Sequence, residues 1–256
     1  MKSDLLTDNK AVFEDKHVVK YFSKYLNGQL NKPEKTILGI LEKRLPGMTM
    51  LDIGVGTGRT AYHFAQKVKE YIGIDYVENM IKKCQERFKG IDGNISFRLA
   101  DARKMDDLQS NYFDFILFSF NGLDFIPHEE RLQALSEIKR VGKKDGIFCF
   151  SSHNLQNNQI FRMNLLKPLS VANYFMMTLL NKDFNKVQHE KYAYIKGTGH
   201  MFRLISYFIR PEEQIKQLQA SGFRNVRIFD LSDGKEIQSA DFYKLNDNYL
   251  HYLCEI

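Results

Sequence analysis

The chain has 256 residues, enough for one sizeable domain, or a domain with a large insertion, and a full hydrophobic core. Hydrophobic residues make up 43% and charged residues 27%, which is ordinary for a globular protein and argues against disorder. The three cysteines are odd in number and share no close spacing, which argues against a disulfide framework or a zinc knuckle. We expect them to be free thiols.

The net charge of +6 is concentrated in one segment. Residues 151–205 contain seven basic and two acidic residues, so this segment alone carries +5. No apolar run near the start is bounded by a small-residue cleavage site, and the longest apolar stretch, 160–180, is interrupted by Arg162, Lys167 and Pro168. We therefore expect a cytoplasmic protein without a membrane span.

Residues 1–45 are predicted to form helices that precede the first strand. Apolar residues recur at helical spacing from Val18 to Leu26, and a second helix opens at Pro33, a residue favoured in the first turn.

From residue 48 to 151, short apolar runs alternate with amphipathic stretches of helical length. The runs are MTMLDIG, YIGIDY, ISFRLA, FDFILFSF and GIFCFSS, and the stretches between them include 58–69, 77–89 and 127–141. Strands that are apolar throughout and separated by helices are typical of a parallel sheet covered on both faces. The pattern predicts a doubly wound α/β fold.

The alternation fails over residues 153–205 and resumes with a helix at 211–221 and the strands NVRIFDL and NYLHYLCEI. A long interruption of this kind usually lies over the carboxyl edge of the sheet, where ligands bind. We predict a core formed by residues 46–152 and 206–256. Residues 153–205 are predicted to be a helical, aromatic-rich substrate cap inserted after the fifth strand.

The stretch LDIGVGTGRT places three glycines after a predicted strand and before a predicted helix. A dinucleotide-binding fingerprint would need its third glycine at position 59, which is Arg59, and the carboxylate of Asp52 would repel a pyrophosphate. Gly54, Gly56 and Gly58 therefore suit a ligand whose carboxylate faces the helix amides and Arg59 while its ammonium lies toward Asp52. S-adenosylmethionine is such a ligand, and its sulfonium adds positive charge.

On these residues the sequence resembles the class I S-adenosylmethionine-dependent methyltransferases, from about residue 35 to residue 256. The resemblance implies a Rossmann-like, mostly parallel seven-stranded sheet, with S-adenosylmethionine as cofactor and S-adenosylhomocysteine as product. It also implies further cofactor contacts: Asp75 on the ribose hydroxyls with Tyr76 beside it, Met80 on the adenine face, Asp101 and Ala102 reading adenine, the backbone of Phe118 and Ser119 at the methionine ammonium, and Tyr21 and Tyr25 in an N-terminal lid. Asp75 and Asp101 could instead be helix N-caps, and Met80 plain core.

His153, just past the fifth strand, is the first choice for a catalytic base, although a loop histidine bonded to backbone would look the same. A base matters when the attacking group starts protonated. His200, Tyr192 and Tyr194 are further candidates from the cap. No metal is expected: the other histidines lack metal spacing, and a site made from Asp124, Asn121 and Asn154 is disfavoured.

The aromatic and basic residues of the cap suggest a pocket with apolar walls and a few cationic contacts, among them Lys167, Lys191 and Arg203. The function we predict is methyl transfer to an amine or hydroxyl of a small anionic metabolite: a sugar, a nucleotide-linked sugar or a phosphorylated compound. A solvated lysine face is the plainer account of the charge. An RNA or protein methyltransferase and a cofactor-binding, non-catalytic subunit remain alternatives, although no nucleic-acid module is recognisable. The oligomeric state is open.

Overall fold

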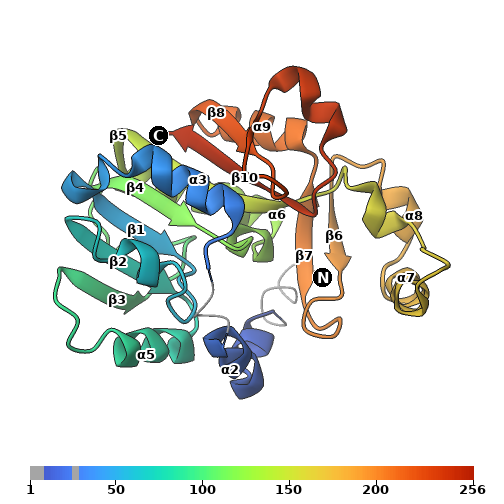
Figure 1. Cartoon of the computed structure of the whole chain (residues 1–256), viewed down its shortest axis with the longest axis horizontal. Coiled ribbons are helices and arrows are strands. Elements are labelled where there is room, and N and C mark those ends of the chain that lie inside the picture. Colours follow the sequence, from blue (N-terminus) through green and yellow to red (C-terminus); the bar gives the residue numbers. More distant parts are fainter. Residues whose placement is uncertain (1–8, 25–28) are drawn as a thin grey trace.

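The computed structural model describes residues 9–24 and 29–256. Within these residues a ten-stranded sheet forms the centre of the molecule, with helices on both of its faces (Figure 1). Tyr25, suggested for the N-terminal lid, lies outside the described residues.

The first five strands of the sheet are the five apolar runs of the sequence. They pair in parallel in the order β3-β2-β1-β4-β5, and their bounds are β1 (Thr49–Ile53), β2 (Glu70–Asp75), β3 (Ile95–Leu99), β4 (Phe113–Phe118) and β5 (Gly142–Asn154). Beyond β5 follow β10 (Tyr249–Glu255), β8 (Arg224–Phe229) and β9 (Glu236–Ile237), each antiparallel to its neighbour. The predicted α/β class is confirmed.

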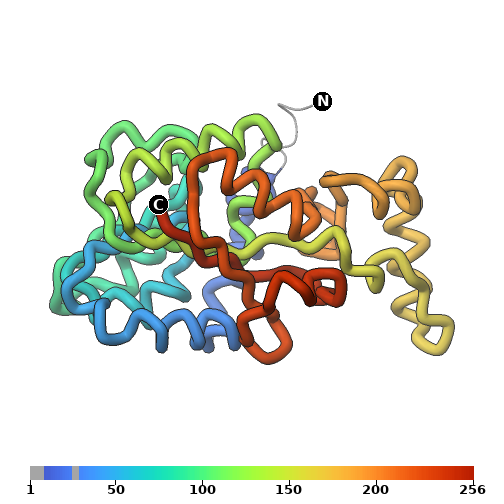
Figure 2. Tube along the Cα trace, turned by 90° about the horizontal axis from the view of Figure 1, so that it is seen from above, coloured from blue at the N-terminus to red at the C-terminus, as the bar shows by residue number. Residues whose placement is uncertain are grey.

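Helices cover the two faces of the sheet in separate hydrophobic layers (Figure 2). One layer contains α3 (Lys32–Leu41), α4 (Ala61–Phe64) and α5 (Glu78–Arg87). The other contains α6 (His128–Val141) and α9 (Pro211–Ala220). The central strands β1, β2 and β4 are buried on both sides, which explains why their sequences are largely apolar, whereas the edge strand β3 is partly exposed.

The predicted number of seven strands is wrong. A hairpin joins β6 (Tyr192–Lys196) of the cap to β7 (Ile205–Ile209), which begins where the predicted cap ends, and β9 adds one short strand. β5 continues past the end of β4, and β7 pairs in parallel with this extension, His153 opposite Phe208. The cap is therefore joined to the sheet through backbone hydrogen bonds.

The helix expected over residues 58–69 is much shorter than predicted. Only Ala61–Phe64 are α-helical, and the chain then turns, with Lys67 N donating to Phe64 O. Cys84, Cys149 and Cys254 are free and buried, as expected.

The cap also holds α7 (Pro168–Leu180) and α8 (Phe184–Val187), which lie at the end of the molecule away from β3 (Figure 1). On the opposite side of the hairpin, α2 (Lys16–Lys24) lies near the carboxyl ends of the central strands. Among the helices of the described chain, none is long and apolar enough to cross a bilayer.

Candidate active site

A cavity of about 1090 Å³ lies where β1, β2, β4 and β5 end. The last residues of the strands line it, together with α2 on one side and the cap on another. Its volume is at the upper end for ligand pockets, so it can hold a nucleoside-sized cofactor and a small second molecule together. Of the predicted site residues, the following line it: Tyr21, Gly54, Gly56, Asp75, Tyr76, Met80, Asp101, Ala102, Phe118, Ser119, His153 and His200.

The glycine loop after β1 makes the floor of the cavity. Gly54 and Gly56 have φ values of +62° and +57°, a conformation that L side chains rarely adopt. A Cβ on Gly54 would also lie 2.9 Å from the Phe118 ring. Gly56 N donates to Asp75 Oδ2 at 2.9 Å, which ties the loop to the end of β2. Gly58 packs on Phe88, outside the cavity lining.

Asp75 is buried at the end of β2, and both of its oxygens accept backbone hydrogen bonds. Gly56 N donates to Oδ2, and Val77 N donates to Oδ1 at 2.9 Å. Burial raises the pKa of Asp75 to about 6. Each carboxylate oxygen retains a second lone pair, so Asp75 can accept from two further donors. The N-cap residue of α5 is Val77.

Asp52 lies beneath the glycine loop, fully buried and outside the cavity lining. Thr60 Oγ1 and Tyr71 Oη both donate to its Oδ2 at 2.5 Å, while its Oδ1 has no hydrogen-bond partner among the described residues. Burial raises the pKa of Asp52 to about 6. Asp52 would therefore act on a cation in the cavity through its charge and not through a hydrogen bond.

Arg59 is held by Glu34, a pairing that the sequence did not indicate. Its guanidinium donates to both Glu34 oxygens, at 2.8 and 2.5 Å, and lies 5.4 Å from the centre of the Phe120 ring. Glu34 is buried in the first turn of α3, where it also closes a capping box with Asn31. Arg59 is not in the cavity lining, although its Nη2 lies 3.4 Å from the Oγ of Ser119, a residue that lines the cavity. Its expected contact with a ligand carboxylate stays a prediction.

The side of the cavity next to β3 carries Asp101, Ala102, Tyr76 and Met80. Burial acts to raise the pKa of Asp101, but hydrogen bonds from Arg103 outweigh this effect and leave the pKa below its usual value. Met80 is buried in a cluster with residues of the N-terminal segment, and the hydroxyl of Tyr76 has no partner within the described residues. This wall is apolar with a few polar atoms, which suits a planar heterocycle.

The N-terminal segment and a loop of the cap meet above the cavity. The His200 ring lies 5.3 Å from Tyr21 and 5.4 Å from Phe22, both on α2. Arg203 forms an ion pair with Asp15 at 2.8 Å. Burial lowers the pKa of His200. His200 therefore packs in a roof over one side of the cavity, formed by α2 and the cap loop.

His153 is bonded to a buried aspartate, Asp124. Its Nδ1 lies 2.8 Å from Asp124 Oδ2, and its backbone N donates to the same oxygen at 2.6 Å. With Nδ1–H donated to a carboxylate, Nε2 is the basic nitrogen of the ring. Asn121 Nδ2 lies 3.3 Å from Nε2, and the Phe208 ring packs against the imidazole at 4.6 Å.

Asp124 is in turn held by Arg131, and both side chains are completely buried. Arg131 donates to Asp124 Oδ1 at 2.8 Å and to Gln214 Oε1 at 2.6 Å, and Ser152 Oγ donates to Asp124 Oδ1 at 2.7 Å. From the sequence, Asp124 was a candidate only as a metal ligand. A signal was present, because Asp124 follows β4 and His153 is the next-to-last residue of β5, and adjacent parallel strands end at the same edge of the sheet.

A family model described as a methyltransferase domain matches residues 45–203, more than half of the chain. The chain belongs to the class I S-adenosylmethionine-dependent methyltransferases. A ubiquinone/menaquinone biosynthesis C-methyltransferase of Ectopseudomonas mendocina (strain ymp) is 28% identical to this methyltransferase over 218 residues, 82% of this chain and 78% of that protein.

Two solved structures share the fold of the methyltransferase. An S-adenosylmethionine-dependent methyltransferase from Mesorhizobium loti has a TM-score of 0.62 at 16% identity, covering 90% of this chain and 100% of that chain. The 1,6-didemethyltoxoflavin-N1-methyltransferase of Burkholderia thailandensis, with bound 1,6-didemethyltoxoflavin and S-adenosylhomocysteine, has a TM-score of 0.62 at 14% identity, covering 100% and 90%.

The residues of this methyltransferase fit its cofactor, S-adenosylmethionine. An unpartnered carboxylate oxygen on Asp52 suits a cationic ligand above the loop, and Gly54 leaves no room for a side chain there. The free lone pairs of Asp75 suit a pair of hydroxyls. The half of the cavity nearest β2 and β3 could hold the nucleoside, and the half beneath the cap would then be open to an acceptor.

Two candidates of the sequence analysis lie apart from the cavity of the methyltransferase. Tyr192 stacks on His128 with ring centres 4.3 Å apart, and the hydroxyl of Tyr194 accepts a hydrogen bond from His128 N. Neither lines the cavity. Asn154, considered as a metal ligand, donates its side-chain amide to the carbonyl oxygens of Leu245 and Asp247. The described residues contain no cluster of three or more His, Cys, Asp or Glu that could hold a metal.

Cationic side chains of the cap divide into two groups. Arg162, Lys167 and Arg203 line the cavity of the methyltransferase. Lys191 instead lies 3.6 Å from Glu213 and outside the lining, so the expected substrate contact of Lys191 finds no support in its position.

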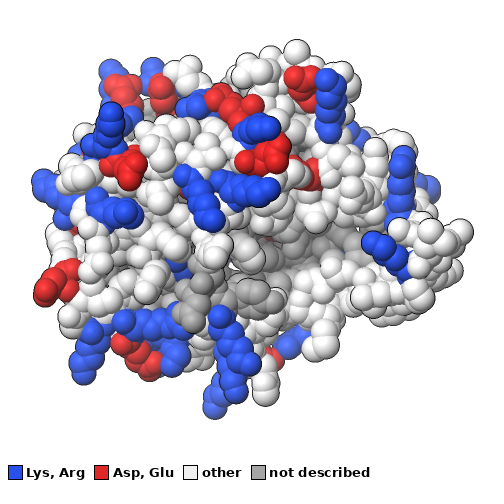
Figure 3. All heavy atoms as spheres, in the orientation of Figure 1, with Lys and Arg blue, Asp and Glu red and all other residues white. Residues whose placement is uncertain are grey.

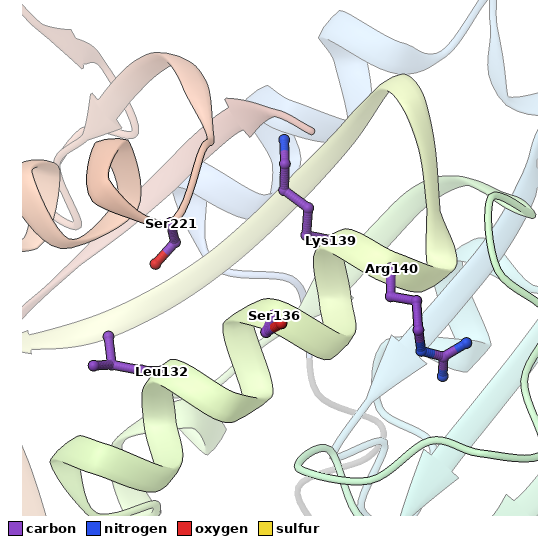
Figure 4. A pocket seen from close by; sticks show the side chains of 5 residues that line it. All are labelled: Leu132, Ser136, Lys139, Arg140 and Ser221. Carbon is purple, nitrogen blue, oxygen red and sulfur yellow. The ribbon is translucent and has the colours of Figure 1, made fainter.

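A second, smaller hollow of about 360 Å³ lies on the outer side of α6 (Figure 4). Its polar groups are occupied: Lys139 Nζ donates to Gly222 O at 2.6 Å, and Arg140 binds both oxygens of Glu137. This hollow is a packing groove between α6 and the end of α9.

Proposed function

We propose that this methyltransferase transfers a methyl group to a hydroxyl or amine of a small anionic metabolite, with His153 as general base. The observation that supports this most directly is the pairing of His153 with buried Asp124 at the acceptor end of the cavity. Asp124 holds the imidazole in the tautomer whose Nε2 can accept a proton. An acceptor hydroxyl would take the place of the Asn121 amide beside Nε2.

The cofactor supplies a methyl group on a positively charged sulfur. For such an in-line displacement, the main task of the protein is to hold the acceptor atom close and aligned. Phe208, Tyr174 and Met177 provide apolar walls for the acceptor. Asp124 also stabilises the charged imidazole that forms when His153 takes a proton.

Arg162 and Lys167 support the anionic character of the acceptor. Both line the cavity, and neither has a carboxylate within ion-pair distance in the described part of the chain. The roof formed by α2 and the 197–203 loop of the cap favours a small molecule over a folded polymer. A candidate base in the cavity, His153, favours turnover over a purely cofactor-binding role.

Carbon is a second candidate for the acceptor atom. Its support is the similarity to C-methyltransferases of ubiquinone and menaquinone biosynthesis. The same base serves both reactions, because removing the proton of a phenol makes the ring carbon beside the oxygen nucleophilic. In that case the hydroxyl next to His153 would direct the methyl group to carbon.

The test replaces His153 by glutamine. With acceptors that carry a hydroxyl or phenol together with a phosphate or carboxylate, we expect kcat to fall by about 10²- to 10⁴-fold, because general base catalysis contributes factors of this size. Binding of S-adenosylhomocysteine, measured by calorimetry, should stay unchanged. Carbon-13 NMR of the labelled product then distinguishes oxygen, nitrogen and carbon attachment.

His189→Gln is the matched control, because His189 is exposed on the cap and outside the cavity. A second arm replaces Arg162 and Lys167 by glutamine, which should raise KM for anionic acceptors, while Lys191→Gln should leave KM unchanged. Wild-type kcat in the His153→Gln variant would contradict the proposed base. Salt-sensitive retention of RNA, with no turnover of small acceptors, would favour the polymer alternative.

A further inference from the structure

The outer side of the cap carries a row of apolar side chains that are not packed against the rest of the protein. Helix α7 contains no charged residue, and of its thirteen residues only Met177 is buried. Large apolar side chains are exposed along α7 and the turn before it: Met163, Leu165, Leu166, Phe175, Met176, Leu179 and Leu180, with Leu169 exposed at the edge of the cavity. Scattered single apolar residues are normal on a surface, but a contiguous group marks a contact site.

Within α7 itself, the exposed apolar residues form one stripe along the helix. Pro168, Ala172, Phe175, Met176 and Leu179 are spaced by three or four residues and are all exposed, so they share the outward face. The opposite face carries residues that line the active-site cavity, including Ser170, Asn173 and Met177. Helix α7 therefore separates the acceptor end of the cavity from an apolar outer surface.

Positive charge borders the stripe. Lys167 directly precedes α7 and Lys182 follows it by two residues, and residues 162–187 contain four basic residues against Asp183 alone. Figure 3 shows the lobe that holds α7 and α8 as largely uncharged, with Lys and Arg side chains on it. A second copy of this chain would bring two cap segments of +5 together, so like charges oppose self-association through this face.

We propose that α7 and the turn before it form a docking surface for an anionic lipid bilayer. An apolar helix face bordered by lysines lies at the headgroup boundary, with its leucines in the acyl region and its cations at anionic lipids. Helix α7 is too short to span a bilayer, so the protein would lie on the membrane surface. This inference does not depend on the identity of the acceptor. It places the cavity mouth near Lys167 next to the lipid, which suits an amphiphilic acceptor.

The experiment is vesicle flotation of the full chain with phosphatidylglycerol–phosphatidylcholine vesicles and with pure phosphatidylcholine vesicles. The test variant is Leu166→Ser with Leu179→Ser, since these side chains are 92% and 78% exposed and outside the cavity lining. The control is Tyr62→Ser with Tyr243→Ser, at 75% and 73% exposure on other parts of the surface. Binding of S-adenosylhomocysteine confirms that each variant is folded.

We expect the wild type and the tyrosine variant to float with anionic vesicles, and the leucine variant to bind at least tenfold more weakly, because burying each leucine side chain favours binding by roughly that factor. Lys182→Gln should weaken binding by about fivefold. Equal binding by both double variants, or no binding to anionic vesicles, would overturn the proposal. The proposal would also be overturned if sedimentation showed that the wild type and the tyrosine variant are dimers while the leucine variant is a monomer.

Discussion

Asp75 shows how burial and hydrogen bonding set the behaviour of a single carboxylate. Burial raises its pKa to about 6, and the amides of Gly56 and Val77 limit this rise because they donate to the ionised form. A hydroxyl pair of a nucleoside also donates to the ionised form, so a bound ligand should lower the pKa further.

Affinity for S-adenosylhomocysteine should therefore depend on pH. Above about pH 6.5 Asp75 is already ionised and the affinity is constant, whereas below its pKa of about 6 a proton must leave on binding. The dissociation constant should then rise by up to tenfold per pH unit. Calorimetry from pH 5 to pH 8 checks this expectation.

Asp75→Asn is the variant that isolates this carboxylate. The variant should bind S-adenosylhomocysteine more weakly than the wild type at pH 8, and its affinity should no longer depend on the titration of residue 75. A remaining pH dependence would come from Asp52, whose pKa is also about 6. Asp106→Asn, which removes an exposed carboxylate, is the control and should behave as the wild type. A flat profile in the wild type would exclude Asp75 as a titrating ligand contact.

Single residues also show where sequence reasoning stops. Gly54, Asp75 and His153 were predicted because each lies at or next to the end of an apolar run, and all three line the cavity since the fold brings the ends of parallel strands together; their roles stay predictions. Arg59 was expected to contact the ligand, but it binds Glu34 on α3. The two residues are 25 positions apart, and no sequence pattern predicts that they form an ion pair.

At the scale of elements, the glycine loop and the end of β4 are packed against each other. Gly54 and Gly56 have nearly equal positive φ values, but only at Gly54 would a Cβ overlap the Phe118 ring, at 2.9 Å, whereas nothing lies within 4 Å at Gly56. The two positions therefore separate backbone strain from steric overlap.

We expect Gly54→Ala to lower the free energy of unfolding by about 1–3 kcal/mol more than Gly56→Ala, the usual cost of overpacking. Urea denaturation of both variants measures the difference. Gly47→Ala, with free space and no positive φ, is the control and should stay within about 0.5 kcal/mol of the wild type. Equal losses for Gly54→Ala and Gly56→Ala would show that the Phe118 ring moves aside at no cost.

Elements buried on both faces could be predicted from the sequence, and elements that depend on distant partners could not. The runs that became β1, β2 and β4 are largely apolar because helices cover both of their sides. The strands β6 and β7 mix apolar and polar residues, and β7 pairs with an extension of β5 more than fifty residues away. Their pairing is a tertiary contact without a local signal.

At the scale of the whole molecule, no structural break separates the predicted core from the predicted cap. The expected cap of 153–205 begins inside β5 and ends where β7 starts, so one sheet runs through both. The division into lid, core and cap stays a prediction about function. Beneath this junction, Arg131 connects Asp124 after β4, Ser152 on β5, and Gln214 and Gln217 on α9.

Arg131→Met should destabilise the whole protein. It leaves the Asp124 carboxylate buried without its cation, and breaking a buried pair in this way costs about 3–5 kcal/mol. The exposed pair Arg227–Glu236 is the control: Arg227→Met should cost less than about 1 kcal/mol, because water already screens this pair. Urea denaturation with a common baseline compares the two. Adding Asp124→Asn to Arg131→Met removes the stranded charge and should restore part of the stability. If Arg131→Met and Arg227→Met cost the same, the buried Arg131–Asp124 pair contributes no more than an exposed pair, and the expected penalty for a stranded buried charge is wrong.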